Sequence, residues 1–140
     1  MSDLERFTQA QEANGSFDEA LRELRDGRKR THWIWWVFPQ LRGLGRSTTS
    51  WTYGIADAAE ARAYLHHEIL GPRLHQAVAA LLAHAGKGVE VVVGADAVKV
   101  RSCLTLFELV DPDDEIFGRA LESLFHGARD PVTVARITAS

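Results

Sequence analysis

The 140-residue sequence lacks the features that mark most secreted and membrane-spanning proteins. Its only cysteine, Cys103, excludes an internal disulfide and is typical of a reducing compartment. No apolar run approaches the ~20 residues that a membrane span needs. The N-terminus shows no basic stretch followed by an apolar one, as a signal peptide would. We therefore expect a cytoplasmic protein that does not enter a membrane, and a monomer.

The sequence also has no excess of positive charge, since 16 lysines and arginines are outnumbered by 19 aspartates and glutamates, which gives a formal net charge of −3. This balance does not favour general attraction to nucleic acid or to anionic membranes. One basic cluster, Arg28-Lys29-Arg30, lies beside aromatic residues, a composition that can bind phosphates and stack bases. Three residues are few for a nucleic-acid footprint but enough for a small anionic ligand. We expect the latter and not nucleic acid.

Metal-ligand spacings are missing as well. His66 and His67 are adjacent, so on a helix their side chains diverge by about 100° and cannot reach one ion. With a single cysteine and no pair of histidines four residues apart, the sequence predicts no metal site. Nucleophile-elbow and phosphate-loop motifs are absent too, and Cys103 is expected on the inner face of a helix. No cofactor is therefore expected.

What the sequence does contain is a dense aromatic segment, Thr31–Gln40. It holds three of the four tryptophans together with a phenylalanine, a histidine and a glutamine. Because each indole removes a large apolar area from water, the segment should be mostly buried. Its polar members, His32, Gln40 and the indole N–H groups, then each need a hydrogen-bond partner. A functional site is most plausible here, between the basic cluster and Gly43–Gly45.

Two residues are candidates for catalysis, His32 and Lys99. His32 can act as a general base or a hydrogen-bond acceptor, although a core histidine bonded to a backbone carbonyl is the simpler interpretation. Lys99 and Ser102 lie three residues apart and share a helical edge, which either lines a pocket or faces solvent. The candidates for ligand binding are Arg28, Lys29, Trp33, Trp36, Gln40 and Ser102.

Together these residues suggest a binder of, or an enzyme for, a phosphorylated, nucleotide- or ADP-ribose-like small molecule, with its pocket around residues 28–47. Arg28 and Lys29 would contact phosphate, and Trp33 and Trp36 would stack a ring. The alternative is a non-catalytic interaction module in which the aromatic segment is only core. The sequence leaves open whether the protein is an enzyme.

Helical periodicity and capping residues predict one compact domain, residues 1–140, of about seven short helices. Two segments remain ambiguous between helix and strand, Trp33–Val37 and Val89–Val93. Ser47–Ser50 is expected to be a loop, and Trp51–Ile55 to be extended. The residues expected to start or cap helices are Ser2, Ser16, Thr31, Asp57, Pro72, Asp96, Asp111 and Asp130.

The run from Lys29 to Gly45, followed by Ser47 and Tyr53, closely resembles the signature of the family called domain of unknown function 1810, sometimes mislabelled calpastatin. The sequence departs from that pattern at Glu68 and Leu104, which are packing positions. Further matching blocks extend the resemblance over nearly the whole chain: Glu60-Ala61, Tyr64-Leu65, Leu70-Gly71, Arg73-Leu74, Asp96, Lys99, Ser102, Thr105–Phe107, Phe125, Gly127, Asp130 and Thr133.

The resemblance implies a mainly α single domain with irregular connections, little or no sheet and no assigned activity. It therefore favours helix or irregular structure for both ambiguous segments. The family is grouped by some with proteins that act on ADP-ribose and other NAD-derived metabolites. No motif of those enzymes is present that would transfer a catalytic residue to this chain.

Overall fold

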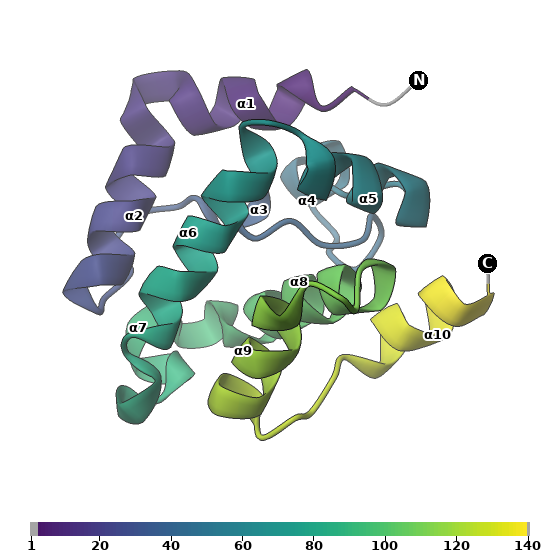
Figure 1. Ribbon diagram of the computed structural model, residues 1–140. Coiled ribbons are helices and arrows are strands. Elements are labelled where there is room, and N and C mark those ends of the chain that lie inside the picture. The colour runs from purple at the N-terminus through teal and green to yellow at the C-terminus, as the bar shows by residue number, and fades with distance from the viewer. Residues whose placement is uncertain (1–2, 140) are drawn as a thin grey trace.

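The computed structural model describes residues 3–139, and these form an almost entirely helical protein (Figure 1). Seven of its α-helices contain eight residues or more, and three short ones have four or five. Within the described residues, extended pairing is limited to one isolated parallel bridge between Leu41 and Ile55. The expected mainly α fold with irregular connections and little sheet is confirmed.

Short turns, three of which contain 3₁₀ segments, join most of the described helices, and longer irregular segments, residues 27–33 and 38–47, lie before and after α3. Their bounds are α1 (Glu5–Glu12), α2 (Ser16–Asp26), α3 (Ile34–Val37), α4 (Thr48–Thr52), α5 (Ala58–His66), α6 (Leu70–Leu82), α7 (Val89–Val93), α8 (Ala97–Val110), α9 (Glu115–Phe125) and α10 (Pro131–Ala139).

Helix α8 is the centre of the packing. Nine of its fourteen residues are buried, and it packs against α5, α9 and α10. Helix α6 lies between α2 and α9, and α1 crosses the end of α2 (Figure 1). The buried apolar residues form one continuous cluster. Rings at its middle, Tyr64, Phe107 and Phe117, contact one another with centroids 5.5 and 5.7 Å apart.

Several predicted helix boundaries are confirmed. Asn14 and Gly15 both adopt left-handed backbone angles between α1 and α2, and Gly27 does so at the end of α2. Asp57 caps α5, because its Oδ1 accepts a hydrogen bond from the Glu60 backbone N–H at 2.8 Å. Asp130 caps α10 in the same way, accepting from the Thr133 N–H at 3.0 Å.

Four predicted caps are wrong. One is Asp111, which follows the end of α8, whereas the residue directly before α9 is Asp114. The other three are wrong for a shared reason. The Ser16 hydroxyl accepts a hydrogen bond from the Trp36 indole, and the Thr31 hydroxyl donates to Glu23. The Asp96 carboxylate binds two lysines and makes no capping bond. Each side chain is thus committed to tertiary contacts around the aromatic segment. The cap expected at Ser2 lies outside the described residues.

The expectations for residues 47–55 are also corrected. Residues 48–52 form helix α4 instead of a loop leading into a strand. Its cap is Ser47, whose hydroxyl oxygen accepts a hydrogen bond from the Ser50 N–H at 3.0 Å. Only Ile55 is extended, in the bridge to Leu41. Both ambiguous segments are helical, as α3 and α7.

The junction of α5 and α6 lies earlier than expected. Helix α5 ends at His66, and α6 begins at Leu70, so Pro72 is within the first turn, where a missing N–H breaks no intrahelical bond. The preceding Gly71 cannot be replaced without moving the chain, because a Cβ there would lie 2.1 Å from the Leu65 carbonyl oxygen. Close packing of the two helices therefore fixes this turn.

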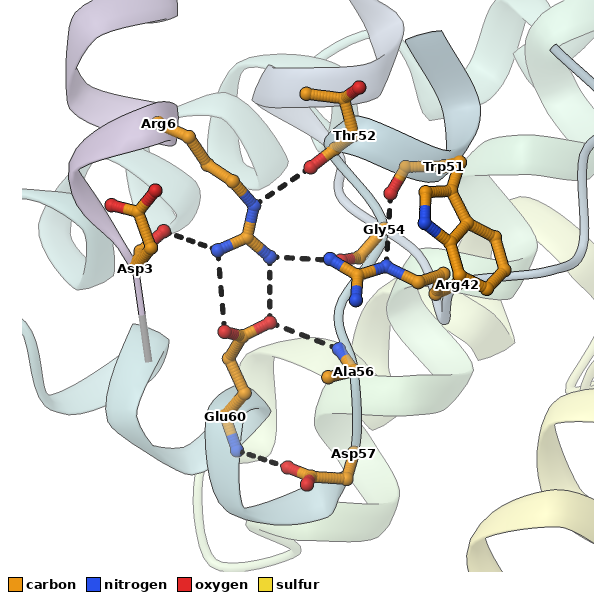
Figure 2. A network of polar contacts seen from close by, with 9 residues as sticks. All are labelled: Asp3, Arg6, Arg42, Trp51, Thr52, Gly54, Ala56, Asp57 and Glu60. Carbon is orange, nitrogen blue, oxygen red and sulfur yellow. Dashed lines mark hydrogen bonds and ion pairs between the residues drawn. The ribbon is translucent and has the colours of Figure 1, made fainter. Parts of the chain in front are cut away.

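An arginine clamp holds α1 against the segment that joins α4 to α5 (Figure 2). Arg6 donates to the carbonyls of Thr52 and Gly54 at 2.8 and 2.9 Å and pairs with Glu60 Oε1 at 2.7 Å. Burial alone would raise the pKa of Glu60, but hydrogen bonds from Arg6 and from the Ala56 N–H lower it below 4.5. The clamp fixes α4, whose first turn borders the candidate site.

The single cysteine is expected to be inert in the folded protein. Cys103 is fully buried, and burial raises the pKa of its thiol well above the ordinary value. An aromatic disulfide reagent at neutral pH should label it roughly a thousandfold more slowly than in urea, since opening a core helix costs several kcal/mol. A Ser123→Cys variant, at an exposed site of α9, should react quickly at the new thiol. Equal labelling rates for the two thiols would contradict the burial of Cys103.

Candidate functional site

A cleft of about 370 Å³ opens along the aromatic segment. It is lined by residues 32–36 together with Lys29, Ser47, Thr49, Asp96 and Lys99. Of the eight residues that the sequence suggests for a site, five line this cleft: Lys29, His32, Trp33, Trp36 and Lys99. The two candidates for catalysis, which come from distant parts of the chain, thus share one cavity.

Glu23 of α2 holds the beginning of the aromatic segment in place through hydrogen bonds. Its side chain is fully buried and accepts four hydrogen bonds, among them one from the Trp33 indole at 2.9 Å and one from the Thr31 hydroxyl at 2.6 Å. The other two come from the backbone N–H groups of Arg30 and Thr31. Burial alone would raise the pKa of Glu23, but these bonds lower it to about 2. The charged carboxylate of Glu23 therefore fixes the backbone of residues 30–31 and the Trp33 ring at the edge of the cleft.

Sequence reasoning missed Glu23. The available signal was its place on an amphipathic helix, three residues after Ala20 and beside Leu24, both of which point inward. A carboxylate at the edge of an apolar face needs a partner, and the N–H groups that follow Gly27 are close in sequence.

A Lys–Asp–Lys cluster, formed by Lys29, Asp96 and Lys99, also lines the cleft. Asp96 holds Lys29 Nζ at 3.0 Å through one carboxylate oxygen and Lys99 Nζ at 2.8 Å through the other. Each ammonium also lies over an indole, Lys29 over Trp33 at 5.1 Å and Lys99 over Trp35 at 5.0 Å from the ring centroid. The two side chains differ in access, because Lys29 is 11% exposed and Lys99 is 33% exposed.

The cluster carries one net positive charge. Burial alone would raise the pKa of Asp96, but hydrogen bonds from Lys99 and Lys29 and their charges lower it. Each ammonium has three N–H donors. Among the described residues, Lys29 uses two donors, on Asp96 and the Thr31 carbonyl, and Lys99 uses one, on Asp96. Three charged donors thus remain for a ligand.

The tryptophans have different roles. Trp33 borders the cleft but is only 1% exposed, so its ring belongs to the core and is not free to stack on a ligand as the sequence suggested. Trp35 and Trp36 are half-buried and have exposed ring surface. Trp36 is held by its indole bond to Ser16 and by an edge-on contact with Tyr53, 5.2 Å between centroids. Trp35, which was not among the suggested residues, also lines the cleft and is more accessible than Trp33.

His32 is exposed at the cleft, so its interpretation as a satisfied core histidine is wrong. Arg28 is exposed too, but it does not line the cleft, and its backbone N–H donates to the Glu23 carbonyl. The remaining two suggested residues, Gln40 and Ser102, line an adjoining pocket of about 300 Å³. Trp35 and Lys99 belong to both cavities, so the two are direct neighbours.

Two classes of site are not found in the part of the chain that the structure describes. Over residues 3–139, no three His, Cys, Asp or Glu side chains come together in a way that could hold a metal ion. None of the helices in that range has the length and apolar character needed to cross a bilayer.

Comparisons with known proteins give a family. A family model described as "Protein of unknown function (DUF1810)" matches residues 1–137. The crystal structure of the conserved hypothetical protein Rv1873 from Mycobacterium tuberculosis is similar, with 41% sequence identity and a TM-score of 0.94. That similarity covers 99% of this chain and 98% of the other. A search of curated proteins gives no match. The chain therefore belongs to the DUF1810 family.

Proposed function

We propose that the protein binds a small phosphorylated molecule with an aromatic ring, such as a nucleotide, in the cleft between the aromatic segment and α8. The observation that carries this proposal is the Lys29–Asp96–Lys99 cluster, in which one carboxylate holds two ammonium groups at 3.0 and 2.8 Å. A purely structural ion pair needs one lysine. The second lysine leaves a positive charge with free donors at the wall of a cleft.

Phosphate is the group that fits these donors. A phosphoryl oxygen accepts strong, charge-assisted hydrogen bonds from ammonium groups, and Lys99 is the more accessible of the two. Ser47 and Thr49 add hydroxyls to the lining of the same cleft. The Ser47 oxygen already accepts a bond from the Ser50 N–H, so its own O–H is oriented away from that bond and can donate.

The aromatic part of the ligand would lie against Trp36 and Trp35. Both rings are half-buried, so they are fixed by packing yet keep an accessible surface. Stacking of a base on such a ring contributes about 1–3 kcal/mol. The cleft volume of about 370 Å³ lies within the ~300–1,000 Å³ usual for small-molecule sites.

Chemistry on that ligand would fall to His32, which is exposed, and to Lys99, the more accessible lysine of the cleft. His32 is exposed beside Trp36 and can accept or donate a proton at a bound group. The competing hypothesis, a non-catalytic interaction module, would be favoured if these two residues lay on opposite faces, and they line the same cavity.

A thermal-shift screen tests the binding proposal. The compounds are nucleotides, NAD, ADP-ribose, sugar phosphates and inorganic phosphate. At a hundredfold excess over Kd a ligand stabilises the folded state by about 2.7 kcal/mol, which raises the Tm by several degrees. The shift should shrink with added salt, because exposed charges are screened. If none of these anions raises the Tm, the interaction-module hypothesis takes the lead.

Charge variants of the cluster should move the affinity in opposite directions. Lys99→Met should weaken binding of the phosphate compound about tenfold, because it removes the most accessible charged donor. Asp96→Asn should strengthen binding about three- to tenfold, because it raises the local charge by one. The measurement is Kd by calorimetry, and Lys87→Met, at the remaining lysine of the chain, is the matched control. Equal weakening of binding in Lys99→Met and in Lys87→Met would point to the overall charge of the protein instead of this cluster.

A further inference from the structure

Gln40, which lines the pocket beside the cleft, has a buried polar atom without a hydrogen-bond partner among the described residues. Gln40 is 5% exposed, and among the described residues its side-chain nitrogen has no hydrogen-bond acceptor. A buried N–H left unpaired costs about 1–3 kcal/mol, so folded proteins retain few of them. Gln40 lines the pocket of about 300 Å³, which makes that pocket the place from which an acceptor could come.

The pocket supplies both donors and acceptors. Ser102 donates its hydroxyl hydrogen to the Val98 carbonyl at 3.1 Å, which leaves the oxygen lone pairs free to accept. Asp130 uses Oδ2 on Thr133, while its Oδ1 lies 3.9 Å from an Arg101 nitrogen, beyond hydrogen-bond distance. Asp130 Oδ1 and Ser102 Oγ can thus accept, while Gln40 Nε2 and Lys99 Nζ can donate. A hydroxyl group, which does both, matches this mixture.

The charge of the pocket separates it from the cleft. Lys99 is shared with the cleft and pairs there with Asp96, so the charged group that the pocket adds is the Asp130 carboxylate, which forms a long ion pair with Arg101 at 3.9 Å. A second phosphate would meet the Asp130 carboxylate and is disfavoured. A neutral polar group is not. Trp35 and Leu44 add apolar surface that suits the carbon face of a compact ring.

We propose that this pocket is a subsite for a neutral, hydroxyl-rich group, such as a sugar, attached to the phosphate that binds in the cleft. The inference rests on the proposed function, because Lys99 and Trp35 belong to both cavities and join the two parts of one ligand. Gln40 donates to a hydroxyl oxygen of this group, and Ser102 and Asp130 accept from its O–H groups.

The test compares ribose 5-phosphate with inorganic phosphate, which has no group for the subsite. Calorimetry should give at least about tenfold tighter binding of ribose 5-phosphate to the unaltered protein. Gln40→Met, which keeps the size and removes the amide, should reduce that ratio about fivefold and leave phosphate affinity within twofold. Its Tm should not fall, because no intramolecular hydrogen bond of the side chain is lost. Gln76→Met, at an exposed glutamine of α6, is the control.

The possible results distinguish failure of the subsite proposal from failure of the cleft proposal. If phosphate binds but ribose 5-phosphate binds no tighter, or Gln40→Met keeps the full ratio, the subsite is refuted and the cleft proposal stands. If neither compound binds, both are refuted. Should Gln40→Met lower the Tm, Ser102→Ala decides, because it removes an acceptor that makes only a local bond to its own helix. An unchanged ratio in Ser102→Ala then overturns the subsite.

Discussion

Replacing Trp33 with alanine should lower the free energy of unfolding by about 3–5 kcal/mol. The indole is 1% exposed, packs against Phe38 with centroids 6.2 Å apart, and carries the Lys29 ammonium over its face. Alanine would leave a cavity and would remove one of the four donors that hold the Glu23 carboxylate. Since a domain is typically stable by only ~5–15 kcal/mol, this single change should remove a large share.

Urea unfolding measures that loss, and Trp51→Ala is its matched control. Trp51 is 60% exposed on α4, and the Arg42 guanidinium lies over its ring at 5.1 Å from the centroid. The control should lose about 1 kcal/mol or less, as surface substitutions usually do. If the two variants unfolded at the same urea concentration, Trp33 would not be the anchor of the aromatic segment.

Most of the helices could be predicted because their signals are local. The left-handed residues Asn14 and Gly27 and the caps Asp57 and Asp130 act within a few residues of the helix ends that they fix. The same reasoning failed at Ser16, whose hydroxyl is taken by the Trp36 indole twenty residues away. A serine or aspartate side chain can bond either to a nearby backbone N–H or to a distant side chain, and the sequence does not show which of these partners is closer in the fold.

The location of the candidate site could be predicted, but its internal organisation could not. A dense aromatic segment beside basic residues must combine burial with polar groups, and this indicated Lys29, His32 and Trp36, whereas Lys99 was suggested by the helical edge that it shares with Ser102. Asp96 was expected to cap α8, but its carboxylate pairs with two lysines. This arrangement could not be predicted, because Lys29 approaches Asp96 only when α8 packs against the segment before α3. Tertiary packing also decides that Trp33 is buried and Trp35 is accessible, because the Trp33 indole is the one that bonds to Glu23.

Glu23 should make the stability of the protein depend on pH in the acid range. Its pKa is lowered from 4.5 to about 2 in the folded state, so the unfolded chain binds a proton at higher pH than the folded one. The stabilisation is therefore fully present above pH ~4.5 and is lost as the pH falls from there towards 2. At ~1.4 kcal/mol per pKa unit, the contribution is about 3 kcal/mol.

A Glu23→Gln variant isolates this contribution from other carboxylates that titrate in the same range. The carboxamide lacks the charge, so the variant should be less stable by about 3 kcal/mol at pH 7. Towards pH 2 the difference should nearly vanish, because a protonated glutamic acid and a glutamine are similar acceptors for the Trp33 and Thr31 donors. Urea unfolding at pH 7, 4 and 2.5 gives the comparison. The control on the same helix is Glu19→Gln, which removes only a partly exposed surface ion pair with Arg22. A difference that stayed constant from pH 7 to 2.5 would mean that the side chain contributes through shape and not through its charge, and the aromatic segment would then need another anchor.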